Sequence, residues 1–282
     1  MYLIVGEPNV TVLESFKSVC EQRNQAVLLL KELPQEFTWR FDGVDSFSEV
    51  VLRDLKVHAD EIKGALVQNP LRITPAFKPE AEYACAETNA VLFAWFSSLA
   101  CPVINRYPAR YWFAPPLCLS LWEGLIRQSG LKTAPAILSN VESELEAFAA
   151  PAGGQVSFEP LCDSAAYRVS TKQAWTGLSK MAAICPVNLT RFFPVRYVAC
   201  IVGNRVFWDL PITSSMADIQ ARLLQMSGAA ELDFLQVYFA ANGADLYVQR
   251  VEPFPKLEVF ADETQRLIAE ALVDRLDLGV RS

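Results

Sequence analysis

The stretch Val195-Arg-Tyr-Val-Ala-Cys-Ile-Val-Gly-Asn-Arg-Val206 decides the architecture of the second half of the chain. Its run of apolar residues up to Val202 predicts a buried strand. Gly203-Asn204 then predicts a tight turn, and Arg205–Asp209 predicts the returning strand. Because two strands joined by two residues pair antiparallel, we expect this half to be built from antiparallel hairpins.

The sequence that follows repeats this pattern. Apolar runs at Phe234–Ala240 and Asp245–Val251 flank Asn242-Gly243, which is a strong hairpin signal. Helices are predicted at Ala217–Ser227 and Thr264–Leu276. This half therefore resembles an α+β arrangement, in which antiparallel strands and helices are grouped.

The first half has a different pattern, in which strands alternate with helices. Strands are predicted at Tyr2–Gly6 and Ala26–Leu30, separated by a helix that Asn9 is predicted to cap and that ends near Arg23. A strand-helix-strand opening favours a parallel sheet. The predicted fold class is therefore α/β in the first half plus α+β in the second, with several lobes.

Composition limits the possible functions. The chain has 282 residues, is 52% hydrophobic and carries a net charge of −7. This apolar fraction is enough for a packed core, and the acidic balance argues against a nucleic-acid partner. The apolar stretches are shorter than the roughly 20 residues that cross a bilayer, and the amino-terminal sequence does not resemble a signal peptide. We therefore expect a soluble, cytoplasmic protein.

The histidine and cysteine content excludes further classes. His58 is the single histidine, so a histidine-rich zinc or iron site is not expected, and a hydrolase triad would depend on this residue. The seven cysteines include no C-x-x-C pair, which favours free thiols in a reducing compartment.

Four segments, taken in order, resemble the ATP-grasp superfamily, in particular its glutathione-synthetase and ribosomal-protein glutamate-ligase branch. They span nearly the whole chain: Pro102-Val-Ile-Asn-Arg106, Gly130-Leu-Lys-Thr-Ala-Pro135, the Val195–Val206 hairpin and Tyr247-Val-Gln-Arg-Val-Glu-Pro-Phe-Pro255. The resemblance implies a multi-lobed, ATP-grasp-like fold. An amino-terminal α/β domain would cover residues 1–116. An ATP-grasp-like domain would cover residues 117–282, with a small lobe at about 117–193 and a carboxy-terminal lobe at about 194–282.

The resemblance also implies a chemistry and the residues that should perform it. Enzymes of this type phosphorylate a carboxylate with ATP, so that an amine or thiol can attack the acyl phosphate. They need a lysine on the phosphates and acidic or amide ligands for Mg²⁺. Here the lysine position holds Glu159, and the Leu-Gln-Glu hinge reads Leu189-Thr190-Arg191.

The metal-binding positions are changed as well. The first metal carboxylate corresponds to Tyr238, and the Glu-x-Asn pair becomes Arg250 and Glu252. Only Arg196, as a catalytic arginine, and Glu252, as an oxygen ligand, match the family's residue types. Ordinary surface roles for Arg196 and Arg250 stay open.

The exchange of a lysine for an acid and of acids for arginines at these positions has two expected consequences. Glu159 is predicted to form an ion pair with Arg191 or Arg250, which would close the site. Mg²⁺ binding is doubtful because a neighbouring arginine repels the ion. ATP stays open as a cofactor, since a guanidinium group can bind phosphate oxygens with two hydrogen bonds.

Three functions follow. The favoured one is a protein with a degenerate ATP-grasp site, which acts as a binding or accessory partner and takes a small molecule or peptide between its lobes. It would pair with an active ligase or with a second copy of itself. The runner-up is an active ATP-dependent carboxylate-amine or carboxylate-thiol ligase, and the third is an unrelated α/β enzyme such as a transferase.

Overall fold

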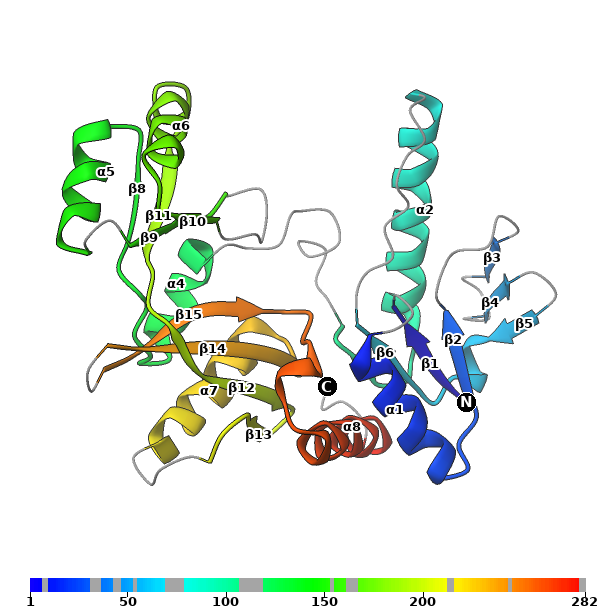
Figure 1. Cartoon of the computed structure of the whole chain (residues 1–282). Helices are drawn as coiled ribbons and strands as arrows, with labels where there is room; N and C mark the ends of the chain where they lie inside the picture. Colours follow the sequence, from blue (N-terminus) through cyan, green and yellow to red (C-terminus); the bar gives the residue numbers. More distant parts are fainter. Residues whose placement is uncertain are drawn as a thin grey trace.

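A computed structural model describes residues 1–6, 10–30, 37–42, 47–52, 55–68, 79–106, 119–152, 155–160, 167–211, 216–242 and 245–278. These residues form four β-sheets with helices packed against them, as Figure 1 shows. One sheet is parallel and the other three are antiparallel, so the predicted combination of α/β and α+β architecture is confirmed.

The parallel sheet has the strand order β2-β1-β6-β7. Its strands are β1 (Tyr2–Val5), β2 (Val27–Leu30), β6 (Gly64–Val67) and β7 (Val103–Ile104). Every residue of β1 and β6 is buried, as expected for strands that are covered on both faces. The parallel pairing predicted from the strand-helix-strand opening is confirmed.

Two helices belong to this part of the chain. Helix α1 (Thr11–Gln22) buries one apolar face, and its cap position is Val10, so the predicted cap at Asn9 is wrong; Asn9 itself lies outside the described residues. At the end of α2 (Pro79–Ser98), the Arg106 guanidinium donates hydrogen bonds to four backbone carbonyls, those of Phe96, Ser97, Leu99 and Cys101.

A three-stranded antiparallel sheet extends from this region. It contains β3 (Phe37–Asp42), β4 (Phe47–Leu52) and β5 (Leu55–His58), in that order. Val50 and Val57 lie opposite each other on β4 and β5 and are buried in the main hydrophobic core. The apolar face of this three-stranded sheet therefore belongs to the same hydrophobic cluster as residues of β1 and β6 in the parallel sheet.

The small antiparallel sheet has the order β10-β9-β11-β8. Its strands are β8 (Ala136–Ser139), β9 (Val156–Phe158), β10 (Tyr167–Val169) and β11 (Val187–Arg191), and α4 (Leu119–Gln128) precedes it. Helices α5 (Glu142–Ala149) and α6 (Lys172–Ala182) cover one face. Helix α6 is absent from the sequence prediction, although Thr171 caps it by accepting a hydrogen bond from the Ala174 amide at 3.1 Å.

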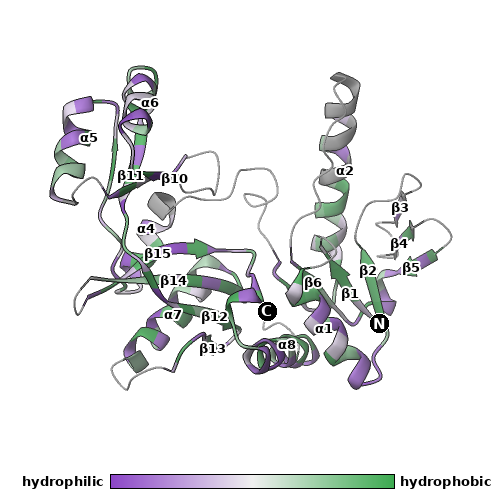
Figure 2. Cartoon of the chain, viewed as in Figure 1, coloured by the Kyte–Doolittle hydropathy of each residue, from purple (hydrophilic) through white to green (hydrophobic). Residues whose placement is uncertain are grey.

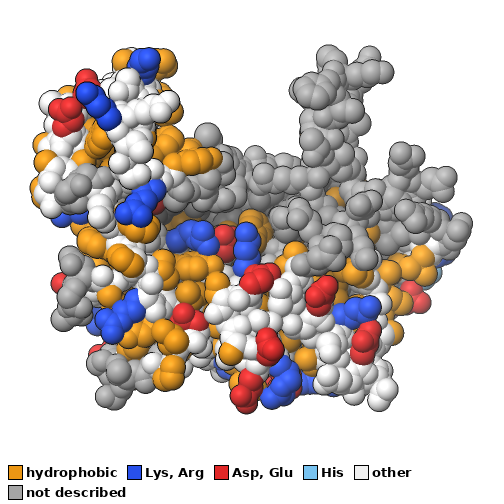
Figure 3. Space-filling model, in the orientation of Figure 1, with side chains coloured by type: hydrophobic (Ala, Val, Ile, Leu, Met, Phe, Trp, Pro, Cys, Tyr) orange, Lys and Arg blue, Asp and Glu red, His pale blue; other side chains and the backbone are white. Residues whose placement is uncertain are grey.

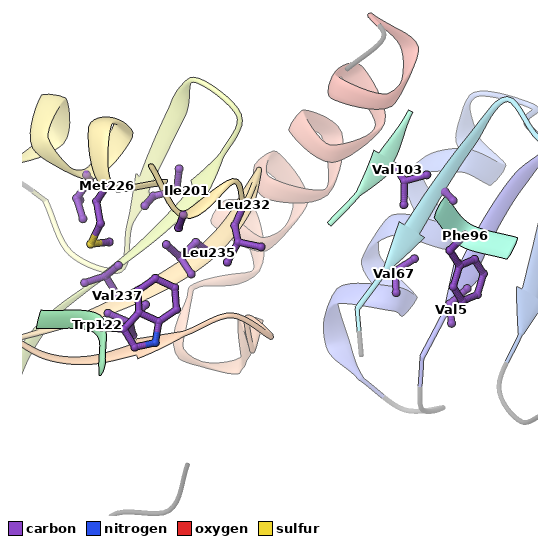
Figure 4. Close-up of a cluster of buried hydrophobic side chains, with 14 of the residues drawn as sticks. Val5, Val67, Phe96, Val103, Trp122, Ile201, Met226, Leu232, Leu235 and Val237 are labelled. Atoms are coloured by element: carbon purple, nitrogen blue, oxygen red, sulfur yellow. The ribbon is translucent and has the colours of Figure 1, made fainter. Parts of the chain in front are cut away.

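The large antiparallel sheet has the order β13-β12-β14-β15. Its strands are β12 (Val195–Val202), β13 (Arg205–Trp208), β14 (Phe234–Asn242) and β15 (Asp245–Glu252). Both predicted hairpins are confirmed, since Val202 pairs with Arg205 and Asn242 pairs with Asp245. Helix α7 (Ala217–Ala230) packs on one face, where Met226 lies with Ile201 and Val237 in Figure 4.

Helix α8 (Asp262–Asp277) packs on the other face and connects the two halves of the molecule. It contacts β12 and β13 of the large sheet, β6 and β7 of the parallel sheet, and α1. One hydrophobic cluster therefore contains Phe16 of α1, Leu272 of α8 and Val198 of β12. Figure 2 shows the corresponding pattern: α1 and α8 mix hydrophobic and hydrophilic residues, whereas the strands they cover are mainly hydrophobic.

Polar contacts reinforce this connection. The Asn105 side chain donates to the Phe234 carbonyl at 2.6 Å and accepts from the Phe234 amide at 2.7 Å. The guanidinium group of Arg23 forms an ion pair with Asp274 at 2.9 Å. None of the helices among the described residues has the length and apolar run that a membrane crossing requires. The domain boundaries at residues 116 and 193 stay predictions.

Candidate functional site

The large sheet brings together three of the positions that the sequence resemblance singled out. Tyr238 on β14 pairs directly with Arg250 on β15, and Glu252 lies two residues further along β15. The Arg250 guanidinium lies 4.2 Å from the centroid of the Tyr238 ring. We call Tyr238, Arg250 and Glu252 the large-sheet group.

Tyr238 and Arg250 form a cation–π stack with one buried and one exposed member. The tyrosine side chain is buried, and burial raises the pKa of its hydroxyl while the positive charge of Arg250 lowers it. Arg250 is exposed. A guanidinium group that lies on a ring keeps its N–H groups pointing outward in its own plane, so it can still donate hydrogen bonds.

Glu252 is held in place by its surroundings. Its Oε1 accepts a hydrogen bond from the Phe254 amide at 3.2 Å. Burial raises the pKa of this carboxyl, and the Phe254 amide, Arg250 and Lys256 act in the opposite direction. Nearby, the Gln236 side chain bonds both backbone groups of Lys256, at 2.8 and 3.0 Å, which fixes the segment after β15.

The raised pKa of Glu252 makes a prediction about stability and pH. An acid whose pKa is raised on folding binds protons more readily in the folded state, so its ionisation destabilises the fold as pH rises through that raised value. Replacing Glu252 with glutamine keeps the acceptor oxygen for Phe254 and removes the charge. We expect the variant to melt about 2 °C above wild type near pH 7 and at the wild-type temperature near pH 4. Melting curves across this range check the result.

A matched control for this prediction is Glu146→Gln on α5, because Glu146 is an exposed carboxylate. The control should leave the melting temperature unchanged across the whole range. An equal gain in both variants, or a Glu252→Gln gain that is also present near pH 4, would contradict the assigned role of burial.

The small sheet places Glu159 and Arg191 on opposite faces. Arg191 pairs with Val156, whose side chain packs against α5 and α6, and the Arg191 guanidinium lies 5.5 Å from the ring centroid of Phe148 on α5. Glu159 follows β9, is 8% exposed, and its amide donates to the Asn188 carbonyl at 3.1 Å. By strand alternation, Glu159 lies on the face turned away from the two helices.

The face that carries Glu159 is lined with polar residues. Ser157 pairs with Thr190 on one side and with Arg168 on the other, so these three share a face. Thr190 is 0% exposed, and among the described residues its hydroxyl oxygen has no hydrogen-bond partner. We call Ser157, Glu159, Arg168 and Thr190 the small-sheet group. A buried hydroxyl without a partner is unusual in a packed core.

Aromatic residues fill the connection between the two sheets. Phe192 and Phe193 follow β11 directly, and Phe193 stacks on Tyr247 of β15 with ring centroids 5.6 Å apart. The Arg168 guanidinium lies 5.0 Å from the Phe192 ring centroid. Arg196, at the start of β12, is exposed and lies 5.4 Å from the ring centroid of Tyr197. The stack of Phe193 on Tyr247 links the end of the small sheet to the large sheet.

The predicted closure of the site by ion pairs does not occur. Among the described residues, no ion pair joins Glu159 to Arg191 or to Arg250. The reason for Arg191 is its position on the helix-covered face of the small sheet. The reason for Arg250 is its stack on Tyr238, which belongs to the other sheet.

The large-sheet group does not fit a magnesium ion. Mg²⁺ prefers an octahedral set of oxygens that includes one or two carboxylates. Here one position holds a phenol, one holds a cation, and the pKa of the remaining carboxyl is raised by burial. Across the part of the chain that the structure describes, no group of three His, Cys, Asp or Glu side chains could hold a metal.

Two other features lie away from these groups. His58 is on β5, where its Nε2 lies 3.6 Å from Oε2 of Glu49. A cavity of about 580 Å³ is lined by the β12–β13 turn and the end of α8, including Arg205, Asp274 and Arg275. None of the five predicted site residues lines this cavity.

Sequence reasoning missed Arg168, Ser157 and Gln236. The alternation in Tyr167-Arg168-Val169 could have indicated a polar face, because Val169 is the apolar residue of that strand. The pairing of Arg168 with Ser157 depends on sheet order and could not be read from the chain.

No protein-family sequence profile and no curated protein sequence matches this chain. Solved structures do match it over nearly its full length. One is the macrocyclase MdnC of Microcystis aeruginosa bound with precursor peptide MdnA, with 16% identity and a TM-score of 0.75, covering 98% of this chain and 100% of that chain. Another is the ATP-grasp ligase PsnB with minimal precursor, Mg and ADP, with 13% identity and a TM-score of 0.73, covering 97% of each chain.

A third match is a RimK domain ATP-grasp protein from Sphaerobacter thermophilus, with 14% identity and a TM-score of 0.60, covering 97% of this chain and 99% of that chain. Identities this low establish the fold alone. The chain therefore has the ATP-grasp fold, as its sequence segments predicted.

Proposed function

We propose that this chain, which has the ATP-grasp fold, is a binding or accessory protein of a peptide-modifying system and not a magnesium-dependent ligase. The observation that carries the proposal is the large-sheet group. Arg250 lies on Tyr238 where the fold family places metal carboxylates, and Glu252 is the one carboxylate of the three positions. An arginine stacked on a tyrosine beside a lone carboxylate disfavours a divalent cation.

The peptide partner is proposed from the structural neighbours. MdnC is bound with precursor peptide MdnA, and PsnB is complexed with a minimal precursor. Both similarities extend over nearly the whole of this chain. We infer that this chain likewise takes a peptide, either alone or together with an active ligase or a second copy of itself, and that ATP is the nucleotide its site would accept.

The test separates binding from turnover. The purified chain is mixed with synthetic peptides from the short reading frames beside its gene, and binding is followed by fluorescence anisotropy. Phosphate release and loss of water from the peptide, by mass spectrometry, are measured with ATP and Mg²⁺. We expect saturable binding of a peptide with neither phosphate release nor dehydration. Turnover that needs Mg²⁺ would instead establish the runner-up, an active carboxylate ligase.

A restoring variant serves as the positive control. Glu159→Lys, Tyr238→Asp and Arg250→Glu together put back the residue types that the fold family uses at these positions. We expect MgATP to stabilise this triple variant against heat more than it stabilises wild type, since a ligand at a hundredfold excess over Kd adds about 2.7 kcal/mol. Stabilisation of wild type by MgATP to the same extent would contradict the proposed loss of metal binding.

A further inference from the structure

Nine of the arginines that the structure describes fall into two groups with different partners. Five form ion pairs with carboxylates: Arg23 and Arg205 with Asp274, Arg127 with Glu123, Arg266 with Glu270, and Arg275 with Asp233. Four lie on aromatic rings: Arg168 on Phe192, Arg191 on Phe148, Arg196 on Tyr197 and Arg250 on Tyr238. No described ion pair involves any of these four.

All four aromatic-stacked arginines belong to the small and large sheets. Arg168 and Arg191 lie on strands of the small sheet, and Arg196 and Arg250 lie on strands of the large sheet. Arginines outside the described ion pairs are therefore found on strands of both sheets that hold the candidate site, although the net charge of the whole chain is −7. Figure 3 shows Lys and Arg side chains beside an acidic one at the centre of this face.

Arg250 has the strongest claim to be a ligand-binding group. It is exposed, its ring contact at 4.2 Å is the shortest of the four, and Tyr238 beneath it is buried. Arg191, by contrast, faces α5. The planar fork of N–H donors of an exposed guanidinium group matches two oxygens of a phosphate group, and an ammonium group lacks this geometry.

We propose that Arg250 binds a phosphate group of a nucleoside triphosphate directly, without a metal ion, at the place where the fold family holds Mg²⁺. Glu252 lies two residues away on the same strand and is held by the Phe254 amide, so a phosphate would have to approach Arg250 from the side away from this carboxylate. Arg168, on the polar face of the small sheet, supplies a second cation that is in no described ion pair. This inference shares one premise with the proposed function, which is that the small and large sheets form the ligand site.

The direct prediction concerns the metal dependence of binding. Isothermal titration calorimetry of the full chain is performed with ATP in excess EDTA and again with Mg²⁺. We expect ATP to bind in EDTA and to bind several-fold more weakly with Mg²⁺, because the ion neutralises phosphate charge that Arg250 would otherwise meet. Binding that requires Mg²⁺ would overturn the proposal.

Variants assign the effect to Arg250. Arg250→Gln should weaken metal-free ATP binding about tenfold or more, and Arg250→Lys should restore part of the loss because it keeps the charge without the fork. Arg266→Gln is the control, since Arg266 is exposed on α8 and pairs with Glu270 of the same helix. Melting temperatures establish that all variants are folded. Equal affinity of the Arg250→Gln variant and wild type would overturn the proposal.

Two more probes identify the ligand chemistry. Inorganic tripolyphosphate should compete with ATP, because the inference places the triphosphate on the arginines. A polyglutamate peptide that displaces ATP while tripolyphosphate does not would overturn it in favour of a carboxylate ligand. These readouts are independent of phosphate release and peptide dehydration. Turnover of ATP with Mg²⁺ would therefore contradict the proposed function, whereas failure of ATP to bind in EDTA would contradict this inference.

Discussion

Replacing Asn105 with alanine is expected to lower the free energy of unfolding by about 2–5 kcal/mol. The Asn105 side chain forms two hydrogen bonds, one with the amide and one with the carbonyl of Phe234, at 2.7 and 2.6 Å. Both residues are buried, so the alanine variant leaves two backbone groups without partners where water cannot reach them. For a chain of this size the melting temperature should fall by roughly 10 °C, measured by circular dichroism.

The control is Asn204→Ala, at an exposed position in the β12–β13 turn. It should change stability by less than about 0.5 kcal/mol, as is usual for surface substitutions. A loss from Asn105→Ala no larger than this would mean that the contact between β7 and β14 contributes little to the fold. The interface between the two halves would then depend on hydrophobic packing alone.

Leu272→Ala is expected to reduce stability by a similar amount, about 2–5 kcal/mol. Leu272 is 0% exposed and belongs to the cluster that α8 shares with α1 and the large sheet. Removing the three outer carbon atoms of the leucine side chain leaves a cavity whose walls come from both halves of the molecule. We therefore expect the near-ultraviolet and far-ultraviolet circular dichroism signals to show unfolding at the same, lowered urea concentration.

Leu267→Ala is the matched control, because Leu267 lies on the same helix and is 39% exposed. It should lower stability by less than about 1 kcal/mol. Two separated unfolding transitions in Leu272→Ala, with one unaffected, would show that α8 stabilises only one half.

The secondary structure that the sequence predicts well is the part governed by local patterns. The β12–β13 and β14–β15 hairpins occur as expected because turn chemistry and strand alternation act over a few residues. Asn242 itself belongs to β14 and pairs with Asp245, and Gly243 lies outside the described residues. Gly130 also ends α4 as its type suggests, with φ of +72°. Helix α6 was missed because its buried positions are Leu178 and Ala182, and two apolar positions give little helical periodicity in the sequence.

The candidate site is less accessible to sequence reasoning, because it depends on which residues share a face. The exchange of lysine for Glu159 can be read from the sequence, but the separation of Glu159 from Arg191 follows from the β9–β11 register. The stack of Arg250 on Tyr238 likewise follows from the pairing of β14 with β15. Residue types indicate altered chemistry, whereas cross-strand pairing determines which partners they meet.

The position of α8 has a consequence for how the chain is made. The apolar face of α1 is covered by a helix that the ribosome synthesises much later, as the pairing of Arg23 with Asp274 across 251 residues shows. The hydrophobic cluster that includes Phe16 is incomplete until α8 has been synthesised, and a nascent chain with an exposed apolar face is prone to aggregate. Truncated variants that lack α8 should therefore accumulate in inclusion bodies.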